Sequence, residues 1–405
     1  MRDDEGARLS RRSGRAALVC AAALLPMALV AAQTAKPQAA ESREVVDGRD
    51  GQLRALLERH RSAHPNIRGE ALAVRTGDWR WSGAVGGTGR HGQALTPAHL
   101  FRVASMTKPV TAAAILRLAE TGRVDLTAPI ERYVAPETAA LLRAGGYDPS
   151  AIKVRDLLAH ASGIRDYAQH PTYTAAVSER PRRRWSRRDQ IAFAMKLGPP
   201  LAPTERVVHY SDTGYVILGE IIERASGQGL ARAARTLLRF DKLGMRETWW
   251  EQLEAKPGAA PVTPGFYGDT DFGAADPSFD LYGGGGLVSS VDEMAIFYRA
   301  LVRGELFDNA NTPAIMLTVG ELDRSTDEFQ TQSNALGIVR AGRFQCWAHG
   351  GFWGSLALHC PEADLTVAWT VNQADVAGSR QDTARFLAGL VEIVAPPSGR
   401  RVAAP

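Results

Sequence analysis

The spacing of apolar residues along the chain predicts strands near both ends and helices between them. Short runs of alternating or continuous apolar positions indicate strands over residues 71–75, 79–84, 336–360 and 365–371. Apolar residues that recur every three or four positions indicate helices over residues 52–60, 189–197, 214–224, 230–238, 292–302 and 380–394. Ser290 with Glu293 forms a capping-box pair for the helix at 292, and Ser379 is the expected cap of the last helix.

This order of elements predicts a mixed α/β fold of the α+β type. The first strands and the last strands are expected to form one antiparallel sheet, built from both ends of a single domain over residues 49–395. Its sheet region comprises residues 49–125 and 285–395, and a mostly helical region, residues 126–284, is inserted between them. Residues 396–405 are then a tail.

A nearly uncharged helix is predicted over residues 104–122, and two polar residues stand where it begins. Ser105 and Lys108 are three positions apart, so they lie on one face of the helix and their side chains can meet. A serine hydroxyl is a weak nucleophile at neutral pH, and an adjacent lysine activates it only where burial or nearby positive charge keeps the amine neutral. Tyr210, if the fold brings it close, can relay the proton.

The N-terminus has the features of an export signal. Arg11, Arg12 and Arg15 precede an apolar run over residues 16–32, which ends in small residues typical of a cleavage site. We expect residues 1–32 to be a signal peptide and residues 33–48 a linker, so that the mature protein is periplasmic or secreted and has no membrane span. The general secretory route fits better than the twin-arginine route, and an uncleaved anchor is the alternative.

Composition and charge restrict the class of protein. The 405 residues are 45% hydrophobic and 23% charged, with a formal net charge of +4, which suits one or two large cores and argues against a dedicated nucleic-acid binder. The nine histidines and three cysteines contain neither an HExxH nor a CxxC motif. The sequence therefore predicts no metal site and no cofactor.

Two cysteines, Cys346 and Cys360, remain once the signal peptide is removed. They lie on two segments that are predicted to pair as a hairpin, so they can face each other and form a disulfide in an oxidising compartment. Two separate buried thiols are the alternative, because a slip of one residue in the strand register would turn the cysteines to opposite faces of the sheet.

Three short motifs together resemble those of the serine β-lactamase and penicillin-binding protein superfamily. They are Ser105-Met106-Thr107-Lys108, Tyr210-Ser211-Asp212 and His349-Gly350-Gly351. The branch that contains class C β-lactamases, D,D-carboxypeptidases and related esterases is also similar in residues 157–164, 210–227, 243–245 and 284–290. The resemblance covers most of the mature chain. It implies helices on both faces of the sheet and a site where the sheet meets the helical region.

The resemblance also implies an acyl-enzyme mechanism and a role for each motif residue. Ser105 is the nucleophile, and Lys108 and Tyr210 move its proton; family members use this tyrosine as a general base and as proton donor to the leaving group. Asp212 stands where asparagine is more usual. A carboxylate there would support a Lys108 ammonium and could attract a substrate amine.

The third motif departs from the family pattern. Many relatives carry lysine, then threonine or serine, then glycine, whereas this chain carries His349 and two glycines. We expect Gly351 to permit close approach of the substrate, and the N–H groups of Phe352 and Ser105 to form an oxyanion hole. A mostly neutral histidine offers less than a lysine to a substrate carboxylate, which counts against efficient β-lactamase activity.

We therefore predict an exported serine hydrolase that cleaves an ester or amide bond in a small-molecule or peptide substrate. An esterase or a D-amino-acid peptidase is favoured over a true class C-type β-lactamase, and a non-catalytic relative that binds peptidoglycan fragments or a protein partner is the alternative of another class. Residues 257–280, where glycine, proline and aspartate accumulate, are expected to influence substrate choice. His160 is expected to anchor its own loop. The oligomeric state has no sequence signal.

Overall fold

The computed structural model describes residues 38–89, 92–201, 209–318, 335–374 and 380–396. The predicted signal peptide and the proposed cap Ser379 lie outside the described residues. The chain divides into two compact units, Met1–Val45 and Val46–Pro405, and the second unit contains the sheet and the helical region. None of the helices in the described ranges combines the length and the apolar character that crossing a bilayer requires.

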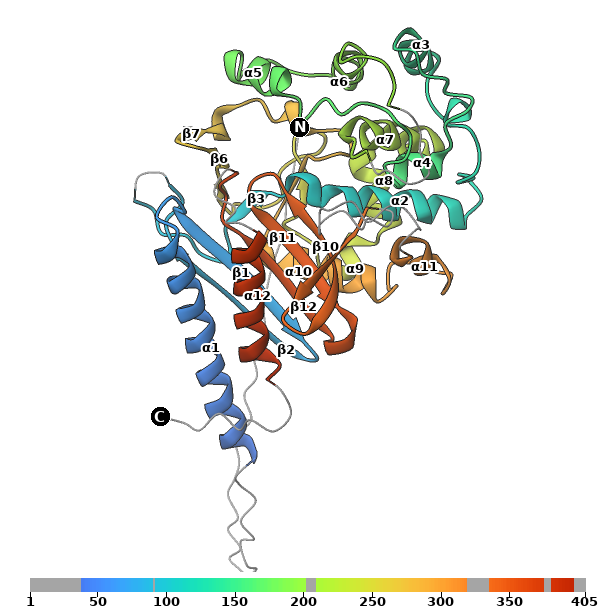
Figure 1. Cartoon of the computed structure of the whole chain (residues 1–405). Coiled ribbons are helices and arrows are strands. Elements are labelled where there is room, and N and C mark those ends of the chain that lie inside the picture. Colours follow the sequence, from blue (N-terminus) through green and yellow to red (C-terminus); the bar gives the residue numbers. More distant parts are fainter. Residues whose placement is uncertain (1–37, 90–91, 202–208, 319–334, 375–379, 397–405) are drawn as a thin grey trace, which may run out of the picture. The chain divides into compact units, whose positions relative to one another are not determined.

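A six-stranded antiparallel sheet forms the centre of the second unit (Figure 1). Its strand order is β2-β1-β12-β11-β10-β9. The strands are β1 (Gly69–Thr76), β2 (Trp79–Gly86), β9 (Gly337–Ala341), β10 (Phe344–Gly351), β11 (Ser355–Cys360) and β12 (Leu365–Thr370). Strand β1 pairs with β12, with Ala71 opposite Thr370. The predicted antiparallel sheet, built from both ends of the domain, is confirmed.

Both faces of this sheet are buried, because successive side chains of a strand point to opposite sides. On β1, Leu72 belongs to one hydrophobic core and Ala71 to the other. Apolar side chains of helices α1 (Gln38–Ala63) and α12 (Arg380–Val394) complete the first core, and those of α10 (Val291–Val302) complete the second. The sheet is thus flanked by helices on both faces, as predicted.

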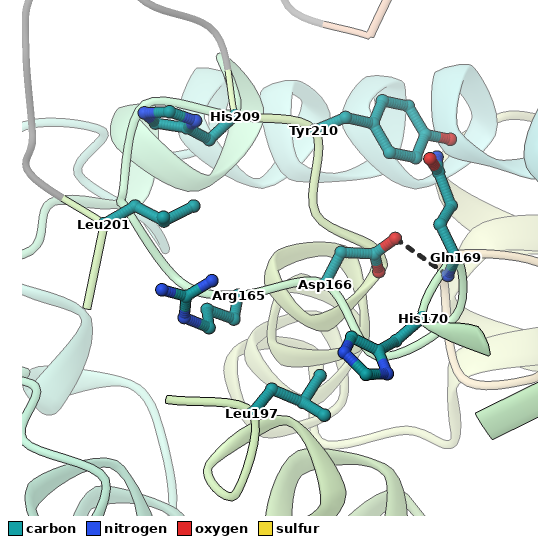
Figure 2. Close-up of a pocket in the computed structure, with 8 residues that line it drawn as sticks. All are labelled: Arg165, Asp166, Gln169, His170, Leu197, Leu201, His209 and Tyr210. Carbon is teal, nitrogen blue, oxygen red and sulfur yellow. Dashed lines mark hydrogen bonds between the residues drawn. The ribbon is translucent and has the colours of Figure 1, made fainter. Parts of the chain in front are cut away.

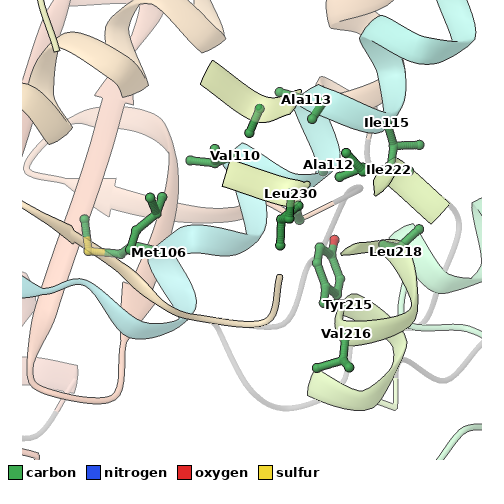
Figure 3. Close-up of a cluster of buried hydrophobic side chains, with 14 of the residues drawn as sticks. Met106, Val110, Ala112, Ala113, Ile115, Tyr215, Val216, Leu218, Ile222 and Leu230 are labelled. Atoms are coloured by element: carbon green, nitrogen blue, oxygen red, sulfur yellow. The ribbon is translucent and has the colours of Figure 1, made fainter. Parts of the chain in front are cut away.

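The helical region packs onto the second core, and helix α2 (Lys108–Glu120) lies at the centre of that core. Helix α7 (Asp212–Ser226) packs against α2 through fully buried side chains that include Ile115, Leu218 and Ile222 (Figure 3). The remaining helices are α3 (Pro136–Ala144), α4 (Val154–Leu158), α5 (Pro171–Glu179), α6 (Arg187–Ala194), α8 (Leu230–Leu237), α9 (Phe240–Leu243) and α11 (Thr312–Leu317). This packing fixes the start of α7 relative to the start of α2.

Two small sheets were not predicted, because their strands are only two or three residues long. The first has the order β4-β8-β3-β5, and the second pairs β6 with β7. Their strands are β3 (Leu100–Arg102), β4 (Trp249–Trp250), β5 (Val262–Thr263), β6 (Phe266–Tyr267), β7 (Thr270–Asp271) and β8 (Leu287–Ser289). Strand β3 ends three residues before Ser105 and therefore helps to position that residue.

Two local predictions need correction. Helix α1 begins at Gln38 rather than at Gln52, so residues 38–48, which were predicted to be part of a linker, are helical. At the start of α10, Ser290 caps the helix by accepting a hydrogen bond from the backbone N–H of Glu293. The Glu293 carboxylate accepts hydrogen bonds from the backbone of residues 246–247 and from Thr248 instead of completing a capping box, because burial brings those donors within reach.

Cys346 on β10 and Cys360 on β11 are joined by a disulfide, the first of the two predicted alternatives. The register of the two strands places Trp347 opposite His359, so the preceding and following cysteines also face each other, with their Cα atoms 4.0 Å apart. Both cysteines are fully buried. The disulfide therefore ties together the two strands next to the His349 motif.

Candidate active site

Ser105 lies in a short 3₁₀ turn, Ala104–Thr107, that leads into helix α2. Ala104 has a positive φ of 48°, which costs about 1–2 kcal/mol in a residue other than glycine, and this conformation bends the chain sharply after β3. In a 3₁₀ turn side chains three positions apart eclipse one another. Accordingly, Lys108 Nζ donates a hydrogen bond to Ser105 Oγ at 2.9 Å. The two side chains meet, as their spacing predicted.

Lys108 is completely buried, and three acceptors surround its amino group. They are Ser105 Oγ, Asp212 Oδ1 at 2.5 Å and the carbonyl of Gly284 at 2.8 Å. An ammonium group has three protons to donate and no lone pair. The contacts therefore fit a charged Lys108 that is paired with Asp212, rather than the neutral amine that the sequence analysis required of a lysine base.

Tyr210 comes two residues before helix α7, whose start is well defined. Ser211 caps the helix by accepting a hydrogen bond from the N–H of Gly214 at 3.1 Å. Lys108 Nζ lies over the Tyr210 ring, 4.8 Å from its centroid, and the phenol lies next to Ser105. Thus α2 and α7 bring the first two motifs together at Ser105.

The Tyr210 phenol stays protonated at neutral pH. Burial raises its pKa well above the ordinary value, and the negative charge of Asp212 adds to this effect. The interaction with the Ser105 side chain opposes the rise in pKa without cancelling it. A resting phenolate is therefore disfavoured at this position.

His160 also packs against Tyr210. Its ring stacks on the Tyr210 ring with centroids 4.5 Å apart, and its Nδ1 accepts a hydrogen bond from the N–H of Ser211 at 3.1 Å. Its carbonyl also accepts from the N–H of His209. Burial, reinforced by the charge of Lys108, lowers the pKa of His160 well below the usual range, so the ring is neutral. The residue ties its loop to the start of α7, as predicted.

Asp166 positions Asp212. One of its carboxylate oxygens accepts hydrogen bonds from the N–H groups of Asp212 and Ala168, and the other accepts from the N–H of Gln169. Burial and the nearby charge of Asp212 raise the pKa of Asp166 to about 7. Two carboxyl groups thus lie close together next to the first two motifs, and Lys108 pairs with that of Asp212.

His349, the third motif residue, lies on β10 beside Tyr210, with ring centroids 6.4 Å apart. Burial, followed by the positive charge of Lys108, lowers the pKa of His349 to about 3. The ring is therefore neutral, and its Nδ1–H donates to the Gly350 carbonyl at 2.6 Å. The predicted neutral histidine is present, and it cannot supply the positive charge that a lysine would.

Gly351 is required by packing within the protein. A Cβ atom on this residue would lie 2.3 Å from the carbonyl oxygen of Val103 and 2.3 Å from Ser355 Oγ. The missing side chain therefore lets the end of β10 approach the backbone just before Ser105, which is a different close approach from the one that we expected with substrate. Phe352 follows directly and is 51% exposed. Its ring stacks parallel to that of Tyr267.

A cavity of about 860 Å³ opens over Ser105. It is lined by the motif residues Tyr210, Asp212, His349, Gly350, Gly351 and Phe352 and by aromatic side chains, chiefly Tyr173, Tyr267, Phe272, Phe279 and Trp353. Its ionisable groups include the carboxylates of Asp212 and Asp280. Among the described residues, no lysine or arginine lines the cavity, because Lys108 is buried beneath Ser105. Six of the seven predicted site residues, all but Lys108, thus line one cavity.

A second, smaller cavity of about 270 Å³ is also lined by Tyr210 (Figure 2). Arg165, Asp166, Gln169 and His209 are among its lining residues, and Gln169 and Tyr210 line both cavities. The dashed line in Figure 2 marks the hydrogen bond from the Gln169 N–H to Asp166. Ser105 does not line this cavity, so the larger one is the candidate active site.

Sequence reasoning missed Asp166 and Asp280 as site residues. Asp280 is the last residue of the segment 257–280, which was expected to influence substrate choice. The segment was therefore predicted to matter, but no role was predicted for Asp280 itself. Asp166 follows the motif segment 157–164 and has no recognisable spacing from the other site residues. Its contact with Asp212 is revealed only by the fold, in which the loop after α4 lies against the start of α7.

The fold and the serine-lysine-tyrosine site define the class of protein to which this chain belongs. Residues 54–392 match the model of the family described as Beta-lactamase, and the chain belongs to that family. Penicillin-binding protein 4* of Bacillus subtilis is 30% identical over 204 residues, which are 48% of this chain and 40% of that protein. Esterase EstB of Burkholderia gladioli is 30% identical over 200 residues, which are 48% of this chain and 50% of the esterase. The matches thus span half or less of these curated relatives.

Solved structures show the same fold. The crystal structure of D-amino acid amidase from Ochrobactrum anthropi SV3 complexed with L-phenylalanine amide has a TM-score of 0.71 and 23% sequence identity. The similarity covers 85% of this chain and 98% of the amidase. At this identity the likeness concerns the fold, and it confirms the predicted α+β architecture.

Proposed function

We propose that this member of the Beta-lactamase family is a serine hydrolase that cleaves an ester or amide bond through an acyl-enzyme on Ser105. The observation that carries the proposal is the set of contacts at Ser105 Oγ, which accepts a hydrogen bond from Lys108 at 2.9 Å, lies next to the Tyr210 phenol and opens to the cavity. A nucleophile needs a neighbouring proton acceptor and a group that stabilises its charge. Tyr210 and Lys108 fit these two roles.

In the proposed acylation, Tyr210 acts as a neutral proton relay. Ser105 Oγ forms a bond to the substrate carbonyl carbon and passes its proton to the Tyr210 oxygen, while the phenol gives its own proton to the departing oxygen or nitrogen. The bond from the carbonyl carbon to the leaving group then breaks, and the phenol ends as it began. The raised pKa of Tyr210 is compatible with this path, because no free phenolate is required. In deacylation, water takes the place of the leaving group. It attacks the acyl carbon and gives a proton to the Tyr210 oxygen, while the phenol returns its own proton to Ser105 Oγ as the bond to the acyl group breaks.

Lys108 has an electrostatic role in this scheme. Its ammonium group stabilises the negative charge that develops on Ser105 Oγ during attack, and Asp212 and the Gly284 carbonyl hold the ammonium in place. The backbone N–H groups of Ser105 and Phe352 are the proposed oxyanion hole. Gly351 lets β10 come close enough to the Ser105 turn for the two groups to share one substrate oxygen.

The charges of the cavity favour an esterase or a D-amino-acid peptidase over a true β-lactamase. A β-lactam carries a carboxylate, and family members bind it through the lysine and hydroxyl that are replaced here by His349 and Gly350. His349 is neutral, and the carboxylates of Asp212 and Asp280 line the same cavity. An anionic substrate would therefore meet repulsion. We further propose that residues 1–32 direct export to the periplasm or the medium, where the disulfide is stable.

The proposal is tested by initial rates of hydrolysis of a chromogenic cephalosporin and of a short-chain nitrophenyl ester, measured side by side. The mature protein is compared with its Ser105→Ala variant, which removes the nucleophile and keeps the fold. We expect turnover that depends on Ser105 and is dominated by the ester. Turnover dominated by the cephalosporin would make the protein a β-lactamase. Equal rates for both proteins would mean that neither substrate is cleaved through Ser105, and would turn attention to D-amino-acid peptides and then to a binding role.

A further inference from the structure

Asp280 is a cavity residue to which neither the sequence motifs nor the proposed mechanism gives a role. It is the last residue of a 3₁₀ turn, Pro277–Asp280, and it lines the same cavity as Ser105. Its carboxylate has no hydrogen-bond or ion-pair partner among the described residues, although carboxylates in such partly enclosed positions are normally paired. This distinguishes it from Asp212, whose carboxylate is paired with Lys108.

The carboxylate has a defined position. A Cβ atom on Gly285 would lie 2.0 Å from Asp280 Oδ1, and one on Gly284 would lie 2.6 Å from Asp212 Oδ1. Two adjacent glycines therefore make room for two carboxylates beside the same stretch of backbone. Replacing either glycine would displace a carboxylate, so the placement of Asp280 depends on the local backbone.

The nearby cations are already paired with other groups. Lys108 is used by Asp212, and Arg102 forms a two-point ion pair with Glu251, at 2.7 and 3.2 Å, and also donates to the Phe272 carbonyl. The charged groups around Asp280 are Asp212, Lys108, Arg102 and Glu251, and their two positive and two negative charges cancel. The negative charge of Asp280 remains without a counterion inside the protein.

The wall next to Asp280 is aromatic. The Phe272 ring lies 5.5 Å from that of Trp353 and 6.3 Å from that of Phe279, and all three residues line the cavity. Aromatic faces attract cations and also bury apolar groups. A ligand that carries an ammonium group beside an apolar side chain would match both features of this wall.

We propose that Asp280 is a specificity residue that binds the ammonium group of a cationic acyl donor, such as an ester or amide of an apolar α-amino acid. The proposal rests on the proposed function, because Ser105 must cleave the acyl bond of the same ligand. Burial and the charge of Asp212 raise the pKa of Asp280 to about 6, which leaves it ionised at pH 7, where an α-ammonium is mostly charged as well.

Two thioesters that differ only in the amine test the proposal. The S-benzyl thioester of phenylalanine, as each enantiomer, is compared at pH 7 with that of 3-phenylpropanoic acid. Charge-assisted hydrogen bonds predict a kcat/KM that is about tenfold or more higher for the better amino thioester. In Asp280→Asn this ratio should fall to about 1. The control Asp269→Asn removes an exposed carboxylate of the neighbouring β6–β7 turn and should keep the ratio.

Binding to the Ser105→Ala variant separates this proposal from the proposed function. Calorimetry measures its affinity for phenylalaninamide and for 3-phenylpropanamide, without any need for catalysis. We expect a preference for the amine that the additional change Asp280→Asn abolishes. An equal affinity for both amides, or a preference that survives Asp280→Asn, would overturn the role of Asp280. Absence of Ser105-dependent thioester cleavage together with the expected binding preference would overturn only the proposed function.

Discussion

Replacing Asp280 by asparagine should stabilise the folded protein above pH 6 and leave its stability nearly unchanged at pH 4. The folded protein raises the pKa of this carboxyl group from 3.8 to about 6, mainly by burial and then by the charge of Asp212. It therefore binds the proton more tightly than the unfolded chain does. The stability that this proton provides is present below pH 4 and is lost as the pH rises to about 6. Asparagine does not ionise, so the variant avoids the loss.

The size of the effect follows from the pKa. A rise from 3.8 to about 6 corresponds to about 3 kcal/mol. Water in the open cavity screens part of this, so we expect about 1–2 kcal/mol, which is about 1–3 °C in Tm for a domain of this size. The nearby charges of Lys108 and Arg102 oppose the rise and are unchanged in the variant.

Thermal unfolding of the wild type and of Asp280→Asn, followed by circular dichroism from pH 4 to pH 8, measures the difference. Other titrating groups are common to both proteins, so the difference in Tm isolates this carboxyl group. It should be near zero at pH 4, grow between about pH 4 and pH 6, and then stay constant. A difference that does not vary with pH, or a variant that is less stable at pH 8, would refute the reasoning, because Asp280 would then have a stabilising partner when ionised.

Three further predictions concern the relay, the glycine contact and the disulfide. Tyr210→Phe should lower kcat for the nitrophenyl ester by about 10²–10⁴-fold with little change in KM, and an unchanged kcat would remove the phenol from the proton path. Gly351→Ala should lower the stability by about 2 kcal/mol because its Cβ atom has no room, whereas Gly350→Ala, with its nearest contact at 3.6 Å, should be tolerated in the same urea titration. The double change Cys346→Ser and Cys360→Ser should lower the free energy of unfolding by about 3 kcal/mol, because the disulfide closes a loop with a sequence separation of 14. Reduction of the wild-type disulfide should lower it by a similar amount in the same urea titration, and a clearly smaller loss would contradict this.

Much of the sheet and its flanking helices could be predicted from the sequence, because those elements have clear apolar patterns. Strand β1 has a short apolar run, and the structure buries it continuously over residues 69–74. Helix α7 has a serine cap and an apolar face, so both elements are recognisable in the sequence. Helix α1 was placed too late, since the small polar residues 38–48 give no apolar period. The two small sheets have strands too short for any period to be visible.

The candidate site was predictable only where short motifs carry it. Ser105 and Lys108 are close in sequence, so their contact followed from the spacing. The pairing of Lys108 with Asp212 joins residues 104 positions apart and depends on how α2 packs on α7. The missing partner of Asp280 could not be predicted at all, because an unpaired carboxylate is recognised only once every neighbouring cation has been placed.

The central claim is that Ser105 forms an acyl-enzyme, and trapping this intermediate tests it most directly. The mature protein is mixed with the short-chain nitrophenyl ester, quenched in acid within the first turnovers, digested and analysed by mass spectrometry. We expect the mass of the acyl group on the peptide that contains Ser105, and no acylated peptide from Ser105→Ala. Hydrolysis by the wild type with the acyl group on another residue, or hydrolysis that persists in Ser105→Ala, would contradict it.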